Sequence, residues 1–195
     1  MRAHFSARTL ACLLLMTVAN MTFAADLGIP DLMQMLGQRK TGTATFIEKK
    51  YIAMLDQPLE SSGELAFSAP DHLEKRTLKP KPESVVLDGN KLVLERADGR
   101  RMTVSLTDRP EVAAFVESIR ATLTGDRTAL EHYYTTGIRG SAEQWQLTLT
   151  PVQSRMLKVI RQIRIAGQHD QVKSIEFMQA DGDHSIMDIT STTSK

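Results

Sequence analysis

The side chains that could act in catalysis are few and lie far apart along the sequence. The histidines beyond the N-terminal segment are His72, His132, His169 and His184. None falls in a spacing such as His-x-x-x-His, which would present two metal ligands on one face of a helix. Ser61 and Ser62 lack the strand–turn–helix pattern that exposes a nucleophile. We therefore predict no catalytic residue and no cofactor.

The acidic stretch "DGDH" is the remaining candidate for a metal site. Asp181 and Asp183 offer oxygen ligands, but a calcium loop needs several more of them at fixed positions. Asp and Gly are also favoured in tight turns, so a hairpin turn explains the stretch better and we predict no metal. A glycosidase-type pair of carboxylates stays open, because the separation of two carboxylates in space cannot be read from the sequence.

The first two dozen residues have the composition of a secretory signal peptide. Arg2 and Arg8 give a basic start, and Leu10–Val18 is an apolar run too short to span a bilayer. Thr22 and Ala24 offer small residues at the minus-three and minus-one positions of a cleavage site, so we predict a signal peptide over residues 1–24 and export to the periplasm. Cys12 lies at the start of the apolar run, away from the cleavage point, and is predicted to be discarded with it.

The remaining residues carry a nearly balanced charge. The whole chain has 24 Lys and Arg against 23 Asp and Glu, and loss of Arg2 and Arg8 leaves a net charge of −1 with the histidines neutral. This balance argues against nucleic acid or an anionic membrane surface as the main partner. Because no repeat, long linker or low-complexity segment interrupts the chain, residues 25–195 are predicted to form one domain.

Alternating apolar residues predict strands over most of this domain. Two Asp-Gly dipeptides, at Asp88-Gly89 and Asp98-Gly99, indicate tight hairpins because their residues readily adopt positive φ angles. Strands are predicted within residues 41–55, 59–69 and 72–79, and three more within residues 83–106, at Val85–Leu87, Leu92–Leu94 and Met102–Leu106. Later strands are predicted over residues 145–151, around Ile163 and Ile165, around Ile175 and Phe177, and over residues 184–190.

Three short helices are predicted among these strands. Ile29–Leu36 has helical apolar spacing and ends at Gly37. A second helix begins at Pro110 and ends before Gly125, and Asp126 can cap a third that reaches Tyr133 or Tyr134. The fold class is therefore α+β and mainly antiparallel β. Such strands must form a sandwich, a barrel, or a half-barrel with helices across its open face, and the pattern does not choose among them.

The stretches "SSGELAFSAPDHL" and "ESVVLDGNKLVL", followed later by "LTP", resemble the periplasmic lipoprotein carrier family LolA. The shared pattern is a strand ending at Pro70, a second strand, a proline spacer at Pro80 or Pro82, and a strand running into Asp88-Gly89. The resemblance extends from about Phe46 to the last strands and covers most of the chain.

This resemblance implies an incomplete, unclosed β-barrel or half-barrel with a helical lid over an apolar cavity. It also implies a soluble carrier that takes acylated lipoproteins from an inner-membrane donor transporter to an outer-membrane acceptor. Periodicity alone favours an ordinary closed core for the same side chains. The residues expected to line the cavity and lid are Phe46, Leu65, Phe67, Leu73, Val85, Leu87, Leu92, Leu94, Met102, Val104, Phe115, Val116, Ile119, Trp145, Leu147 and Leu149.

Two departures from the family pattern bear on the lid and the cargo. The family often has an arginine immediately before the strand-ending proline, where it bonds to the lid, but here that residue is Ala69. The aromatic residues usual after the proline are replaced by Leu73, Glu74, Lys75 and Arg76. The sequence is similar to a LolA-related branch associated with acyl-chain or aryl-polyene pathways, so the cargo is a lipoprotein or another lipid.

Three functions follow as hypotheses. The first is a monomeric periplasmic carrier of lipidated or acylated cargo. The second is an enzyme on the same scaffold that acts on an acyl-type substrate, with His72 and a nearby carboxylate as candidates. The third is a non-carrier interaction module of the envelope, which a cavity too small for one acyl chain would favour.

Overall fold

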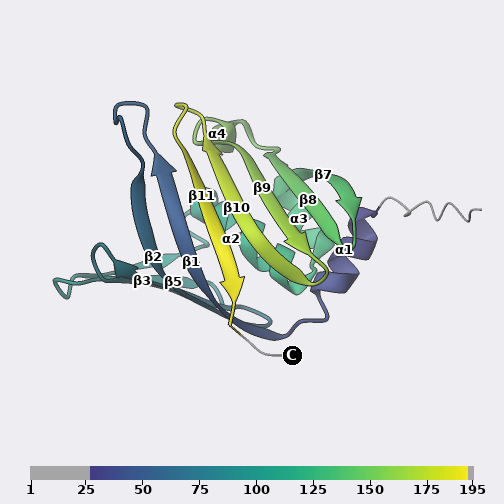
Figure 1. The fold of residues 1–195 in the computed structure, drawn as a ribbon, viewed down its shortest axis with the longest axis horizontal. Helices are drawn as coiled ribbons and strands as arrows, with labels where there is room; N and C mark the ends of the chain where they lie inside the picture. Colours follow the sequence, from purple (N-terminus) through teal and green to yellow (C-terminus); the bar gives the residue numbers. More distant parts are fainter. Residues whose placement is uncertain (1–26, 193–195) are drawn as a thin grey trace, which may run out of the picture.

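One antiparallel sheet forms the body of the computed structural model, which describes residues 27–192 (Figure 1). Its strands are β1 (Thr41–Tyr51), β2 (Leu59–Ser68), β3 (His72–Lys79), β4 (Glu83–Asp88), β5 (Lys91–Arg96), β6 (Arg101–Ser105), β7 (Tyr134–Ser141), β8 (Gln144–Pro151), β9 (Ile160–Gln168), β10 (Gln171–Gln179) and β11 (His184–Ser191). The described helices are α1 (Ile29–Leu36), α2 (Pro110–Thr124), α3 (Arg127–Tyr133) and α4 (Ser154–Leu157).

The sheet is unclosed, and its two edge strands follow one another in the sequence. The strand order is β6-β5-β4-β3-β2-β1-β11-β10-β9-β8-β7, so pairing of β1 with β11 joins two runs of hairpins. β6 and β7 are the two edge strands, and α2 and α3 lie between them in sequence. The chain thus crosses from one edge to the other as helices, behind the sheet in the view of Figure 1. The predicted half-barrel with a helical lid is confirmed.

A glycine in the middle of β2 allows the sheet to bend. A Cβ atom at Gly63 would lie 1.9 Å from the carbonyl oxygen of Arg76, so no other residue fits without moving a strand. The register between β2 and β3 also shifts between Ser62 and Gly63. Strands β3 to β6 therefore turn away from the plane of β1 and β11, as Figure 1 shows, and the sheet becomes concave.

The helix ends follow the capping residues in the sequence. Gly125 ends α2 with φ of 71°, and a Cβ atom there would lie 2.1 Å from the carbonyl oxygen of Met33 in α1. Asp126 accepts a 2.9 Å hydrogen bond from the backbone N–H of Ala129 and so caps α3. Glycine at this corner lets α1, α2 and α3 pack closely together. In the part of the chain that the structure describes, no helix is long and apolar enough to cross a membrane.

The largest core lies where these helices cover β7 to β10. Trp145, Leu147 and Leu149 of β8 are at most 1% exposed and pack with Ile163 and Ile165 of β9. The other end of the sheet carries a much smaller buried cluster of Leu87, Leu106 and Val116. One sheet therefore has a closed end and an open end.

Two elements of the structure, β7 and α4, were not predicted from the sequence. β7 was not predicted, because "YTTGIRGS" has two glycines and little apolar alternation, and α4 is only four residues long. Both predicted hairpin glycines adopt positive φ, at 55° for Gly89 and 79° for Gly99. The predicted signal peptide, with Cys12 and the cleavage point after Ala24, lies outside the described residues.

Candidate functional site: an apolar cavity

A cavity of about 540 Å³ lies between the concave face of the sheet and α2. Cavities that hold small ligands commonly measure roughly 300–1,000 Å³. Its wall is contributed by β1 to β5, by β9 to β11 and by one face of α2. The volume is large enough for a ligand, and most of the side chains around it are aliphatic or aromatic.

The strand register places the sheet residues of this wall in two parallel rows. Directly paired residues point to the same face of a sheet. The first row runs across five strands through Gly42, Phe67, Leu73, Leu87 and Leu92. The second runs through Ala44, Leu65, Lys75 and Val85. Small residues on β1 and larger aliphatic ones on β2 to β5 leave the concave face open.

Helix α2 closes the cavity from the other side. Its residues at the cavity are Val112, Phe115, Val116, Ile119, Thr122 and Leu123. Phe115 packs against Phe177 of β10 with ring centroids 4.9 Å apart, yet it remains 39% exposed. Val116 is buried against Leu87. The helix thus rests on the sheet at two separate places and spans the space between them.

The structure brings nine of the sixteen predicted residues to the cavity wall. These are Leu65, Phe67, Leu73, Val85, Leu87, Leu92, Phe115, Val116 and Ile119. They come from β2, β3, β4, β5 and α2, which lie around one space although they span more than fifty residues of sequence.

The three predicted residues on β8 do not belong to this wall. Trp145, Leu147 and Leu149 face inward as predicted, but α1, α2 and α3 cover this part of the sheet and close it. Gly167 makes room for the indole, since a Cβ atom there would lie 2.3 Å from the ring of Trp145. The indole N–H donates a 2.8 Å hydrogen bond to the carbonyl of His169. These residues are core, and the sequence-based assignment was wrong for them.

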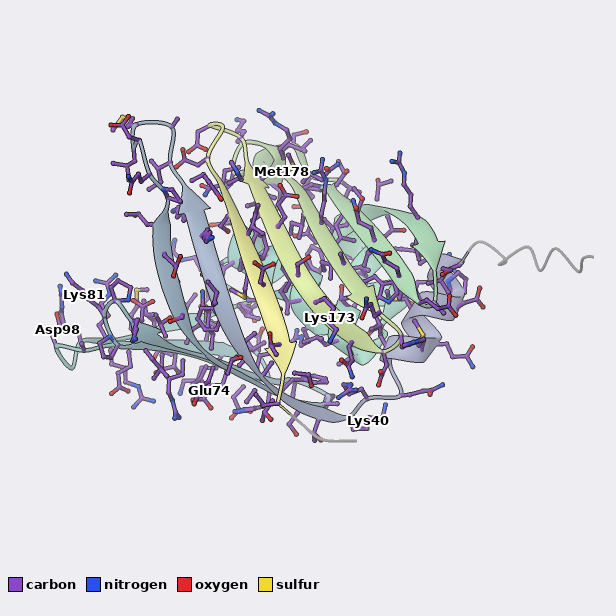
Figure 2. All side chains as sticks on the ribbon, viewed as in Figure 1. Lys40, Glu74, Lys81, Asp98, Lys173 and Met178 are labelled. Carbon is purple, nitrogen blue, oxygen red and sulfur yellow. The ribbon has the colours of Figure 1, made fainter. Side chains whose placement is uncertain are left out.

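Four further predicted residues also lie off the wall. Leu94 pairs with Met102 near the β5–β6 turn, and Met102 is 55% exposed. Figure 2 shows Asp98 on this turn at the far tip of the sheet, away from the helices. Val104 lies on edge strand β6 beyond the cavity. Phe46 faces inward on β1, but the ammonium of Lys75 lies 4.8 Å from its ring centroid and covers it.

The C-terminal strands supply wall residues that the sequence-based selection omitted. They are Ile160, Ile165, Val172, Ile175, Phe177, Met187 and Ile189. Their alternation was visible in the sequence, but pairing of β11 with β1 was not, so nothing indicated that these strands share a concave face with β2 and β3.

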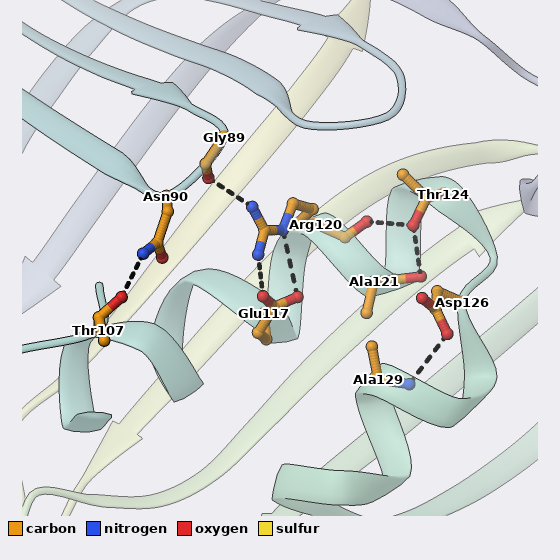
Figure 3. A network of polar contacts seen from close by, with 9 residues as sticks. All are labelled: Gly89, Asn90, Thr107, Glu117, Arg120, Ala121, Thr124, Asp126 and Ala129. Carbon is orange, nitrogen blue, oxygen red and sulfur yellow. Dashed lines mark hydrogen bonds and ion pairs between the residues drawn. The ribbon is translucent and has the colours of Figure 1, made fainter. Parts of the chain in front are cut away.

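An arginine of α2 ties the helix to the sheet. Arg120 donates a 2.6 Å hydrogen bond to the carbonyl oxygen of Gly89, in the β4–β5 turn, and forms an ion pair with Glu117 (Figure 3). The side chain of Arg120 is only 19% exposed. Ala69, which replaces the arginine of the family pattern, cannot make such a bond. In this protein the helix supplies the arginine and the sheet supplies the acceptor.

Two ion pairs interrupt the apolar wall. Lys75 pairs with Glu48 at 2.5 Å, and Arg39 pairs with Asp170 at 2.9 Å. Lys50 also lines the cavity and makes no ion pair within the described residues. Glu74, which pairs with Arg76 at 2.9 Å, and several uncharged polar side chains also line the cavity.

The candidate catalytic residues do not converge. His72 is paired with Asp88 across the strands but faces the side of β3 opposite to Leu73. His184 stacks on Tyr51 with centroids 4.5 Å apart, and His132 and His169 lie on other elements. Within residues 27–192, no cluster of His, Cys, Asp and Glu could hold a metal ion.

The hairpin turn predicted at "DGDH" is present. Asp181 accepts a hydrogen bond from the backbone N–H of Asp183, and Gly182 between them has φ of 101°. Asp183 in turn accepts a 3.0 Å hydrogen bond from Ala53. These carboxylates fix the β10–β11 turn and tie it to the end of β1.

An unclosed antiparallel half-barrel with helices over an apolar cavity defines a binding or carrier scaffold. A family model described as "Outer membrane lipoprotein carrier protein LolA-like" matches residues 21–192, and the chain therefore belongs to this family. The family is associated with lipoprotein sorting or carrier roles. No curated protein matches the chain.

Solved structures with a similar fold are distant in sequence. A LolA superfamily protein from Nitrosomonas europaea is 8% identical, with a TM-score of 0.47 over 84% of this chain and 92% of that one. A domain assigned to outer membrane lipoprotein sorting, from Vibrio parahaemolyticus, is 9% identical, with a TM-score of 0.49 over 86% and 92%. The family membership rests on the family model and not on these likenesses.

Proposed function

We propose that the protein is a periplasmic carrier that holds the acyl chains of lipidated or acylated cargo in this cavity and ferries the cargo between membranes. The observation that carries the proposal is the apolar volume of about 540 Å³ kept open between the sheet and α2. Membership of the LolA-like family supports it. The cargo is an outer-membrane lipoprotein or a related lipid, received from an inner-membrane donor and passed to an outer-membrane acceptor.

The energetics of transfer explain why an open apolar cavity is useful. Exposing an acyl chain to water costs about 0.8 kcal/mol per CH₂, so a chain of about 16 carbons faces about 12 kcal/mol. A wall of aliphatic side chains removes most of that cost, because it resembles the bilayer interior as a solvent. The free energy of the acyl chain is then similar in the membrane and in the cavity. The carrier can therefore both take up its cargo and release it.

Helix α2 is suited to admit such a chain. On its cavity side, the contacts of α2 with the sheet are the Phe115–Phe177 pair, the packing of Val116 and the Arg120 hydrogen bond to Gly89. The opposite side of the helix is held in the closed core through Ala114 and Ala121, so only the few contacts on the cavity side can break and re-form without opening that core. We propose that the contacts between α2 and the open end of the sheet separate when cargo enters and that Arg120 holds them closed when the cavity is empty.

Lipid extraction of protein purified from its native envelope tests the proposal. Mass spectrometry of the extract is expected to find an acylated molecule at up to one equivalent per chain. A delipidated sample is expected to bind a fluorescent fatty acid and to release it when unlabelled lipid is added. If the purified chain carries no acylated molecule and binds none, the carrier proposal fails and a non-carrier role in the envelope is favoured.

A further inference from the structure

The inward-facing positions of β1 change character along the strand. Gly42, Ala44 and Phe46 are small or apolar, whereas the next two inward positions are Glu48 and Lys50. Ser185, opposite Lys50, and Gln179 of β10 lie at the same end of the cavity wall. The inward face of β1 is therefore apolar from Gly42 to Phe46 and charged at Glu48 and Lys50, and the end of the cavity beside Lys50 is called its polar end. The opposite end, beside Gly42, carries the Arg39–Asp170 ion pair.

Lys75 brings a second positive charge to this polar end. It lies between Leu65 and Val85 in the apolar row of the wall, and its ammonium reaches Glu48 at 2.5 Å over the ring of Phe46. Gly63, the residue paired with Phe46 on β2, has no side chain. The aliphatic stem of Lys75 can thus remain part of the apolar wall while its ammonium group is held beside Glu48.

Stability alone does not account for this arrangement. An ion pair in an apolar wall loses hydration, and replacing such a pair by hydrophobic residues is often neutral or stabilising. The side chains of Lys75 and Glu48 are 31% and 19% exposed, so both remain accessible from the cavity. An ammonium has three donors, and the bond to Glu48 uses one of them.

The charges at this end do not cancel. Lys75 and Glu48 neutralise each other, and Lys50, exposed at the end of β1, adds one positive charge without an ion-pair partner in the described residues. By contrast, Arg39 and Asp170 at the other end form a closed pair through two hydrogen bonds, of 3.1 and 2.9 Å. An anionic group that enters beside Lys75 and Lys50 would complete the charge balance.

We propose, on the basis of the carrier function proposed above, that Lys75 and Lys50 bind the anionic head group of the cargo. The ligand class is an amphiphile with one aliphatic chain and one negatively charged group, a carboxylate or a phosphate. The chain lies along Leu65, Leu92 and Ile119, and the head group lies at the polar end of β1. Glu48 holds Lys75 in place and competes with the ligand for its ammonium.

A displacement titration with ligands of one chain length tests this assignment. An uncharged fluorescent probe is bound in the cavity and displaced by dodecanoate, dodecyl phosphate, dodecanol or dodecyltrimethylammonium. The wild-type protein is expected to bind an anion about tenfold more tightly than dodecanol, and the cation more weakly than dodecanol, since charge-assisted bonds favour the anion. Comparison of the two anions identifies the source: preference for dodecanoate indicates a fatty acid, and preference for dodecyl phosphate indicates a phospholipid-like head group.

Four variants test the part that Lys75 plays in this preference. Lys75→Met is expected to lose most of the preference for the anion over dodecanol, and Lys75→Arg to keep it. Glu48→Gln is expected to bind the anions several-fold more tightly, because the competing carboxylate is gone. Lys49→Met, a neighbouring lysine on the outward face of β1, is the matched control and is expected to behave as the wild type.

The outcomes separate the two proposals. Equal binding of anion and dodecanol by the wild type, or an unchanged preference in Lys75→Met, would overturn the head-group site and leave the carrier proposal intact. Failure of all four ligands to displace the probe would overturn both.

Discussion

The two ends of the sheet use the same strand pattern for opposite purposes. On β8 and β9, inward residues such as Leu147 and Ile163 are fully buried under helices and form a close-packed core. On β2 to β5, inward residues such as Leu65 and Leu92 are half-buried around a cavity. The difference lies in what covers each end. Three helices pack on the β8–β9 end, whereas only one face of α2 spans the β2–β5 end. Alternation of apolar residues along a strand therefore does not by itself produce a packed core.

The largest expected effect separates the two ends by stability. Leu147→Ala should lower the free energy of unfolding by about 2–5 kcal/mol, because it leaves a hole in a packed core. Leu65→Ala should cost about 1 kcal/mol, because the side chain already borders open volume. Urea unfolding of both variants measures the difference. Equal losses would mean that the cavity end is packed as firmly as the closed end.

The second prediction concerns pH at the closed end. The Tyr134 hydroxyl donates a 2.9 Å hydrogen bond to the carbonyl of Ala114, and burial raises the pKa of Tyr134 to about 12. The unfolded chain loses this proton near pH 10, before the folded protein does. The stabilisation from the protonated Tyr134 is therefore complete below pH 10. Between pH 10 and pH 12 the free energy of unfolding should fall by about 2–3 kcal/mol as this stabilisation is lost.

Tyr134→Phe isolates this contribution. The variant should lose about 1 kcal/mol at neutral pH through the missing hydrogen bond, and its stability should fall less than that of the wild type between pH 10 and 12. Chemical unfolding at a series of pH values compares the two slopes. Identical slopes would show that Tyr134 does not titrate differently in the folded and unfolded chains.

The third prediction fills the open end. Ala44→Phe places a large side chain on the inward face of β1, inside the cavity. Lipid affinity should fall by tenfold or more, while the free energy of unfolding changes by about 1 kcal/mol or less. Thr45→Phe, on the outward face of the same strand, is the control and should bind lipid normally. Unimpaired binding by Ala44→Phe would place the lipid elsewhere.

The smallest expected effect concerns the tie between the two ends. Arg120→Met removes the hydrogen bond to Gly89 and should speed release of a bound fluorescent lipid several-fold, with a modest loss of stability. Arg127→Met removes an exposed ion pair with Glu131 in α3 and serves as the control. Stopped-flow dilution measures both release rates. Equal rates for Arg120→Met and the wild type would rule out a latch at this position.

Local sequence signals predicted the local structure well. Gly89, Gly99, Gly125 and Asp126 each act at the turn or cap that their residue type indicates. β7 escaped prediction because, among its central residues, only Ile138 is a large apolar one, and its position as an edge strand needs no more. Turns and caps depend on neighbouring residues, so a single sequence contains them.

The site was predictable only in part, because its wall depends on distant pairing. Inward-facing residues could be chosen by alternation, which selected Leu65 and Leu87 at the cavity wall, but the same rule selected Leu147 in the closed core. The helices cover Leu147 and leave a cavity beside Leu65 and Leu87, and alternation along the strands does not indicate where the helices lie. Arg120 was missed for a related reason, since its partner is a backbone carbonyl 31 residues away.

A crystal structure of the protein in complex with 12-bromododecanoate, a fatty acid with bromine on its terminal carbon, would locate the ligand directly. The account predicts an anomalous bromine peak inside the cavity, among the side chains of Leu92, Val116 and Ile119, with the carboxylate toward Lys75 and Lys50. A cavity that holds no bromine, or a concave face filled by the protein's own side chains, would contradict it.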